Sequence, residues 1–288
     1  MQDANINGHS EQQKYDCGDY VNMRFGPAGY PSESKNPKDA LDILQSLGLN
    51  ALEMEYVRGV KTSKEKATEF GQMAKKYDIR LTAHAPYFVS LNSEKDETRV
   101  RSLDWIMDTV RVAHYLGAYI IVIHAASYGK TPNEATKNVI TGVSKCKDIM
   151  DDEGIKDVTI GLETMGRPAT WGTLKEIAEV MDNVDGVRPV LDVCHVHARD
   201  KGCLKTVQNM KDMVEEFFKL ADDRPHFHIS CINYGEKGEI NHLPLSAKEP
   251  DMSLLVEALD DCKKDCNFIC ESPLLEKDAV LFKNMFDA

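Results

Sequence analysis

The stretch Tyr119-Ile-Ile-Val-Ile-His124 holds four β-branched residues in a row and ends on a histidine. Such a run is typical of a strand that is covered on both faces, because both of its sides then need apolar side chains. A second run, Thr159-Ile-Gly-Leu-Glu163, ends on an acid. Both runs predict buried strands of a parallel sheet whose carboxyl ends carry polar side chains.

Comparable runs recur along the whole chain, and amphipathic stretches of helical periodicity lie between them. The eight predicted strands are Val21–Phe25, Ala51–Glu55, Arg80–His84, Tyr119–His124, Thr159–Glu163, Arg188–Asp192, Phe227–Cys231 and Asn267–Glu271. The predicted helices are Pro37–Leu47, Ser63–Tyr77, Glu94–Leu116, Thr131–Asp152, Thr173–Met181, Cys203–Leu220, Met252–Lys263 and Lys277–Phe286.

This alternation places the chain in the α/β class and favours a single (β/α)8 TIM barrel. A doubly wound open sheet is the alternative. No GxGxxG motif follows any of the predicted strands, so we expect no nucleotide cofactor.

Length and composition set further bounds. The chain has 288 residues, of which 42% are hydrophobic and 28% charged, as in globular proteins with a sizeable core. The most apolar stretch, Ala118–Ala126, is far shorter than the roughly 20 residues of a membrane span. The polar residues 1–18 have no apolar core of a signal peptide and predict a disordered tail. We therefore expect a cytoplasmic protein whose barrel domain covers residues 19–288.

The charge balance bears on possible partners. Lys and Arg number 35 against 47 Asp and Glu, which gives a formal net charge of −12. This argues weakly against non-specific binding to nucleic acid, although bound metal cations could reverse the sign of the field within a cleft. The eight cysteines are expected to be reduced thiols, since a chain of this length needs no disulfides.

Metal-ligand side chains occupy six successive predicted strands, at or near their carboxyl ends. They are His84, His124, Glu163, Asp192, His228 and Glu271. In a parallel barrel these ends share one mouth. Imidazoles and carboxylates suit Zn²⁺, and also Mn²⁺ or Fe²⁺. The set is too large for one tetrahedral ion, whereas two ions bridged by a carboxylate would use it economically.

Other side chains extend this set. His195 follows Asp192 by three residues, and His242 lies in a predicted loop above the same mouth. His226 is adjacent to a stronger candidate and is assigned no role. Tyr87 and Arg58 follow the third and second strands. They are either ordinary loop residues or a stacking ring and a phosphate-facing charge.

From about Asn22 to its C-terminus the chain resembles the endonuclease IV family of apurinic/apyrimidinic endonucleases. The order and spacing of several segments carry the resemblance: Thr82-Ala-His-Ala-Pro-Tyr87 with Asn92, Val122-Ile-His124, Ile160-Gly-Leu-Glu163, Leu191-Asp-Val-Cys-His195, Phe227-His-Ile-Ser230, His242-Leu-Pro-Leu245 and Ile269-Cys-Glu-Ser-Pro273. The opening Arg24-Phe-Gly-Pro-Ala-Gly29 and the stretch Glu53-Met-Glu-Tyr-Val-Arg58 look closest to archaeal members.

The resemblance implies a trinuclear zinc site that incises DNA on the 5′ side of an abasic site through a metal-bridging hydroxide. It assigns His84, His124 and Glu163 to a first ion. The catalytic Glu163 would bridge to a second ion, and His195 and His242 would hold a third. The second ion would be completed by Asp192, His228 and Glu271. Tyr87 matches a family residue on a DNA-contacting loop, and Arg58 is a looser match.

One position departs from the family pattern. The family has a metal-binding aspartate two residues before the loop histidine, whereas this chain has Ile240. The adjacent Glu239 could take its place if the loop shifts. We therefore expect the third metal position to be the weakest.

A related group of barrels contains sugar isomerases and epimerases that use a single divalent ion. Glu163, Asp192, His228 and Glu271 would serve such an enzyme equally well. It would not need His84 and His124 as ligands, so their presence favours the nuclease. A barrel without catalytic activity is the third possibility.

Overall fold

The computed structural model describes residues 23–287. Within them, one sheet holds eight parallel strands in the order β1-β10-β7-β6-β5-β4-β3-β2. The strands are β1 (Arg24–Pro27), β2 (Ala51–Glu55), β3 (Arg80–His84), β4 (Ile120–Ile123), β5 (Thr159–Glu163), β6 (Val187–Asp192), β7 (His226–Ile229) and β10 (Asn267–Cys270). The predicted TIM barrel is confirmed. The predicted tail at residues 1–18 lies outside the described residues.

The barrel is nearly closed between β1 and β2. Ala28 and Glu53 form a parallel bridge, and the Gly29 N–H donates to the Glu53 carbonyl oxygen over 2.9 Å. A side chain at Gly26 would meet a neighbouring strand, because its Cβ would lie 1.8 Å from the Ala51 carbonyl oxygen. Glycine therefore allows β1 and β2 to approach each other here.

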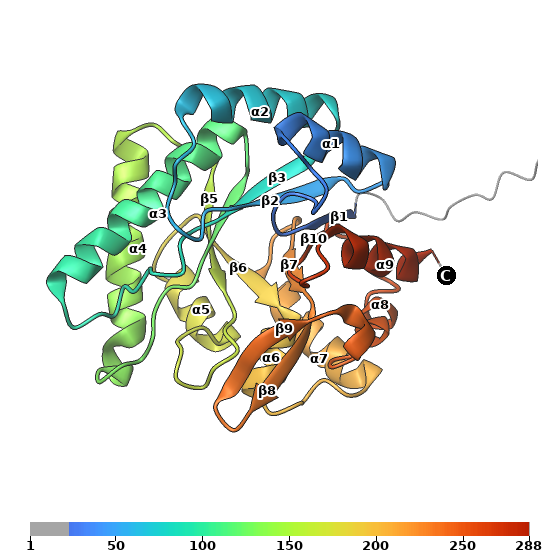
Figure 1. The fold of residues 1–288 in the computed structure, drawn as a ribbon. Helices are drawn as coiled ribbons and strands as arrows, with labels where there is room; N and C mark the ends of the chain where they lie inside the picture. The colour runs from blue at the N-terminus through green and yellow to red at the C-terminus, as the bar shows by residue number, and fades with distance from the viewer. Residues whose placement is uncertain (1–22, 288) are drawn as a thin grey trace, which may run out of the picture.

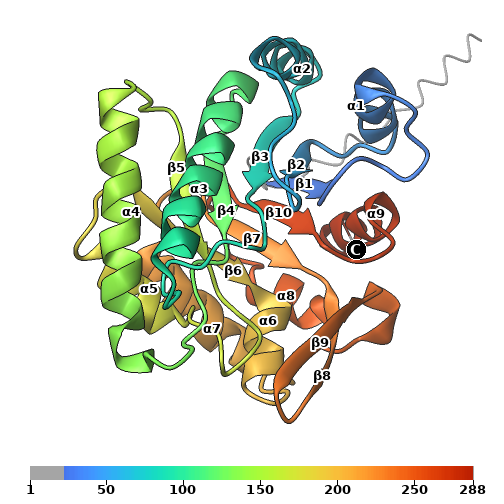
Figure 2. The ribbon, with the colours of Figure 1, turned by 60° about the vertical axis from the view of Figure 1, so that its left-hand side comes forward.

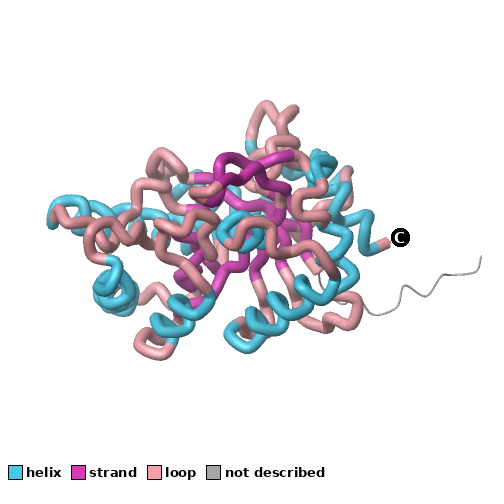
Figure 3. Tube along the Cα trace, turned by 90° about the horizontal axis from the view of Figure 1, so that it is seen from below, coloured by secondary structure: helices cyan, strands magenta, loops and turns pink. Residues whose placement is uncertain are grey.

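Helices surround the strands, as Figures 1 and 3 show. Eight of those in the described residues are α1 (Pro37–Ser46), α2 (Lys64–Lys76), α3 (Asp96–Leu116), α4 (Ala135–Asp152), α5 (Leu174–Met181), α7 (Val207–Leu220), α8 (Met252–Ala258) and α9 (Glu276–Phe286). The side chains of Ser63, Thr173 and Thr206 cap α2, α5 and α7 at their N-termini. Among residues 23–287, no helix has the length and apolar character needed to cross a membrane.

The structure differs from the sequence prediction mainly around the later strands. The helix predicted from Cys203 begins at Val207, because Thr206 is its N-cap. The helix predicted to reach Lys263 ends at Ala258. A short helix, α6 (Val193–Arg199), was not predicted; it begins directly after β6.

An antiparallel hairpin, β8 (Cys231–Gly235) and β9 (Gly238–Leu243), follows β7 and was also not predicted. It stands beside α6 (Figure 2). The predicted loop position of His242 is therefore wrong, because His242 is a strand residue paired with Ile232. The hairpin approaches the loop after β5 closely, since a Cβ at Gly238 would lie 2.2 Å from the Gly166 carbonyl oxygen.

Candidate metal centre

The carboxyl ends of β3 to β7 and β10, together with α6 and β9, bring the predicted ligands into three adjoining groups. The first group is His84, His124 and Glu163; the second is Glu163, Asp192, His228 and Glu271; the third is His195, Glu239 and His242. Within each group, one nitrogen or oxygen atom per residue lies within 4.8 Å of all the others. Glu163 belongs to the first two groups, and its Oε1 lies 3.1 Å from Nδ1 of His195 in the third, so the three form one continuous centre.

In the first group, Glu163 of β5 faces two histidines from the neighbouring strands. Its Oε2 lies 2.9 Å from Nε2 of His124 and 3.3 Å from Nε2 of His84. Glu163 and His84 are fully buried, whereas the His124 side chain is 22% exposed. This group therefore opens to solvent through His124.

In the second group, the other carboxylate oxygen of Glu163 faces His228 of β7. Oε1 of Glu163 and Oε1 of Glu271 each lie 3.4 Å from Nδ1 of His228. Strand register brings Asp192 alongside, because Asp192 of β6 pairs with His228. Asp192 also caps α6, since its Oδ1 accepts the N–H of His195 over 2.7 Å. The Asp-x-x-His spacing thus determines both where α6 begins and where His195 lies relative to Asp192.

The third group joins α6 to the hairpin. Nε2 of His195 lies 3.5 Å from Oε2 of Glu239. The hairpin pairing shifts register here: Asn233 pairs with Asn241, but Tyr234 pairs with Glu239. Ile240 is the extra residue of this β-bulge, and 56% of it is exposed. A bulge reverses the alternation of side chains, so Glu239 turns to the same face as His242.

The imidazoles in these groups are held by their other ring nitrogens. His84 and His195 donate from Nδ1 to the carbonyl oxygens of Ala85, over 2.7 Å, and Thr164, over 3.0 Å. Nδ1 of His242 lies 2.9 Å from the Ser230 hydroxyl. Each of these histidines therefore presents Nε2 to its group, which is the arrangement of metal-ligating histidines.

The chemistry of the centre fits divalent cations. Glu163 Oε1, Asp192 Oδ2 and His228 Nδ1 are buried atoms without a hydrogen-bond partner, and all three belong to the second group. Such groups are rarely left unpaired in folded proteins unless an ion or water satisfies them. Burial and the carboxylates of Glu163 and Asp192 raise the pKa of Glu271 well above its usual value. Cations would relieve this concentration of negative charge.

A cavity of about 540 Å³ opens over the centre. Tyr87 and Arg167 line it together with residues of the first and third groups. The Tyr87 ring stacks on His124 with 5.1 Å between centroids, yet 51% of the residue is exposed. Arg58 is exposed on the turn after β2 and is not among the described residues that line this cavity.

Sequence reasoning missed several residues near the centre. Glu53 and His226 are fully buried beside His228, although His226 was assigned no role. Burial raises the pKa of the neighbouring Glu55 to about 7. Glu53 and Glu55 could have been noticed from the sequence, because both lie in a strand that was expected to be covered on both faces. A carboxylate in such a place needs a partner. Arg167 gave no such signal, because it lies on an exposed loop.

Comparisons with known proteins agree with this architecture. A family model described as xylose isomerase-like TIM barrel matches residues 41–281. An uncharacterized protein of Methanocaldococcus jannaschii is 31% identical over 279 residues, which cover 93% of this chain and 98% of that protein. A protein of Shouchella clausii named probable endonuclease 4 is 29% identical over 147 residues, which cover 49% of this chain and 48% of its own length.

Solved structures of two kinds of protein share the fold of this chain. Endonuclease IV from Thermus thermophilus superposes with a TM-score of 0.70 at 19% identity, covering 92% of this chain and 97% of that one. A D-tagatose 3-epimerase-like protein gives the same TM-score and identity and covers 92% of this chain and 96% of that one. These similarities show the fold alone. The sequence match and the eight-stranded barrel together establish that this chain belongs to the xylose isomerase-like TIM barrel family.

Proposed function

We propose that this protein is a metal-dependent phosphodiesterase that incises DNA on the 5′ side of abasic sites. The observation that carries the proposal is the contiguity of the three ligand groups, with Glu163 shared between the first two. A single-ion enzyme needs the second group only. The paired imidazoles of His84 and His124, and the third group beyond them, are explained by a multinuclear centre.

Two or three divalent ions would activate a water at neutral pH and neutralise charge on a phosphoryl group. Zn²⁺ is the first choice for these ligands, and Mn²⁺ or Fe²⁺ are the alternatives. The side chains of the protein hold and orient these ions. Glu163 directs one carboxylate oxygen to each of the first two groups. The histidines keep their outer nitrogens occupied, so their ligating nitrogens need no reorganisation.

Residues at the cavity rim suit a DNA substrate. The exposed face of Tyr87 offers a stacking surface to a base or sugar that is displaced from the duplex. The Arg167 guanidinium lines the same cavity and suits a phosphate contact. Because the chain carries a net charge of −12, attraction for DNA should come from these groups and from bound cations. Arg58 stays a peripheral candidate for a phosphate contact.

The second group alone also fits the single-ion sugar isomerases and epimerases, and this is the competing function. A variant of the first group separates the two activities. His124→Asn should abolish nuclease activity but leave a single-ion epimerase largely active. The matched control is His114→Asn, because His114 lies on α3 and pairs with Asp157 away from the centre.

The test incubates metal-loaded protein with a duplex that contains one abasic site, with the same duplex undamaged, and separately with ketoses. We expect incision of the abasic duplex only, leaving a 3′-hydroxyl, with loss in His124→Asn and retention in His114→Asn. Conversion of a ketose without incision, insensitive to His124→Asn, would replace the proposal with the epimerase.

A further inference from the structure

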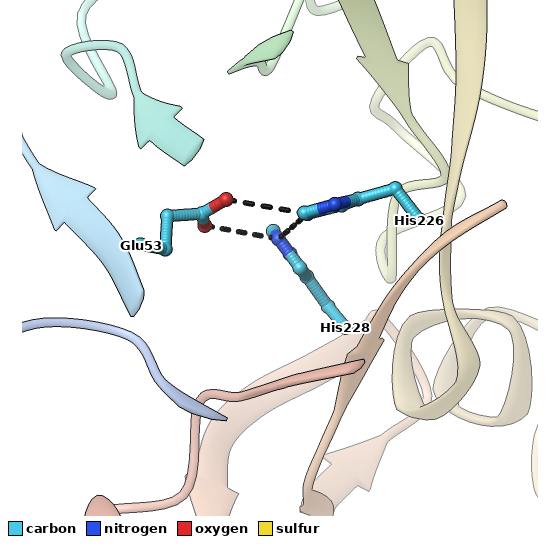
Figure 4. A group of neighbouring side chains, drawn as sticks. All are labelled: Glu53, His226 and His228. Carbon is cyan, nitrogen blue, oxygen red and sulfur yellow. Dashed lines mark hydrogen bonds and ion pairs between the residues drawn. The ribbon is translucent and has the colours of Figure 1, made fainter. Parts of the chain in front are cut away.

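Below the metal centre, the barrel interior holds a carboxylate clamped between two imidazoles. Glu53 of β2 faces His226 and His228 of β7, and all three side chains are buried (Figure 4). Oε1 of Glu53 lies 3.0 Å from Nε2 of His228. Oε2 of Glu53 lies 3.2 Å from Nε2 of His226. Glu53 and His226 belong to none of the three groups of the centre.

Surrounding side chains fix the Glu53–His226 pair. The Thr82 hydroxyl donates to Oε2 of Glu53 over 2.8 Å. On the far side of the imidazole, Nδ2 of Asn267 donates to Nδ1 of His226 over 3.1 Å. Because Nδ1 of His226 then accepts, its proton lies on Nε2 and faces the carboxylate. Oε2 of Glu53 therefore accepts from Thr82 and faces the His226 N–H, while Oε1 has no hydrogen-bond partner and faces Nε2 of His228. The Nε2 atoms of the two imidazoles lie 3.3 Å apart (Figure 4).

His228 differs from the other histidines of the centre in which nitrogen it presents. It turns Nδ1 toward Glu163 and Glu271, whereas His84, His195 and His242 present Nε2. The outer nitrogens of those three are held by backbone carbonyls or a hydroxyl. The outer nitrogen of His228 is Nε2, and the carboxylate of Glu53 faces it. A carboxylate in that place fixes the tautomer and makes the ligating nitrogen more basic.

We propose that Glu53, braced by His226, is a positioning residue that keeps the His228 proton on Nε2 and directs its Nδ1 lone pair to the second group. The inference rests on the metal centre of the proposed function, but it concerns ion binding rather than incision. His226 contributes by occupying the second oxygen of Glu53, so that the carboxylate cannot rotate away. Glutamine at position 53 cannot reproduce this, because its amide group would set a donor against an imidazole N–H.

The test measures Zn²⁺ retention in the metal-loaded full chain against a series of chelators of increasing affinity. In Glu53→Gln we expect the ion of the second group to bind about 10- to 100-fold more weakly, with the ion of the first group unchanged. Imidazole nitrogen NMR of the zinc-loaded wild type should show His228 protonated at Nε2, and this signature should weaken in the variant. If Glu53 only supported the fold, its replacement would not change the affinity of the second ion and the tautomer of His228 while leaving the first ion unaffected.

Two further variants keep the test decisive. Glu276→Gln is the matched control, because Glu276 is a buried carboxylate that binds Ser32 outside the centre, and it should retain every ion. If Glu53→Gln fails to fold, Thr82→Val removes one donor to Glu53 and should weaken the same ion to a smaller extent.

Wild-type affinity for the second ion in a folded Glu53→Gln, or a His228 proton on Nδ1, would overturn the proposal. So would anomalous scattering from a zinc ion between Glu53, His226 and His228, since the cluster would then be a metal site itself. Failure of the proposed function can be distinguished from failure of this inference. In that case ion binding and the Nε2 protonation of His228 would be as expected, but no DNA would be cut.

Discussion

Replacing Glu239 with alanine should release the ion of the third group and leave the first two groups intact. Only the imidazoles of His195 and His242 would remain, whereas a catalytic zinc ion normally has three protein ligands. The attraction between the Glu239 carboxylate and the ion can be scaled from two unit charges about 4 Å apart, which interact by about 4 kcal/mol at an effective dielectric constant of ~20. The Glu239 side chain is 18% exposed, so water recovers part of this interaction. We therefore expect a loss of about 3 kcal/mol, or roughly 100-fold in affinity.

The assay is a zinc titration against a chromophoric competitor, run alongside incision of an abasic duplex at fixed free zinc. Ile240→Asp is the informative partner variant. The Ile240 side chain packs near Gly235 and is largely exposed, so a carboxylate there should raise neither zinc affinity nor incision rate. Unchanged zinc binding in Glu239→Ala, or a gain in Ile240→Asp, would refute the inference that the bulge directs Glu239 into the centre.

Three other outcomes follow from the same structure. Glu163→Gln should lower incision to less than about a tenth of the wild-type rate with the fold intact, because the first two groups share this carboxylate; rate assays and circular dichroism check both parts. Removal of metal by a chelator should weaken binding to an abasic duplex by roughly tenfold or more, since the chain is acidic; fluorescence anisotropy measures this, and equal affinity of the two forms would contradict it. Gly161→Ala should destabilise the barrel by about 1–3 kcal/mol, because its Cβ would lie 2.7 Å from Cγ2 of Val190 and 2.9 Å from the Ile121 carbonyl oxygen; urea unfolding with an unchanged midpoint would count against this.

The fold was predictable because its signal is local and repeated. Runs such as Tyr119–His124 need cover on both faces, and the alternation with helices leaves few topologies other than a barrel. Strand ends such as His84 and Glu163 then converge through topology alone. No side-chain detail was needed to place them at one mouth.

The hairpin and the interior cluster were not predictable in the same way. The direction of Glu239 depends on a bulge at Ile240, which is set by pairing between β8 and β9 rather than by the local sequence. The role of His226 depends on contact with Glu53, which lies far away in the sequence. Long-range contacts of this kind leave no periodic pattern, so a histidine adjacent to a stronger candidate looked ordinary.

A multinuclear metal centre at one barrel mouth can be tested by counting the transition-metal ions bound per chain. The count is made by elemental analysis of a monodisperse sample that was purified without chelators. The three contiguous groups predict at least two ions per chain, with the third at lower occupancy. A single ion per chain would contradict a multinuclear centre and leave the second group as a mononuclear site, and no ion at all would contradict any metal centre here.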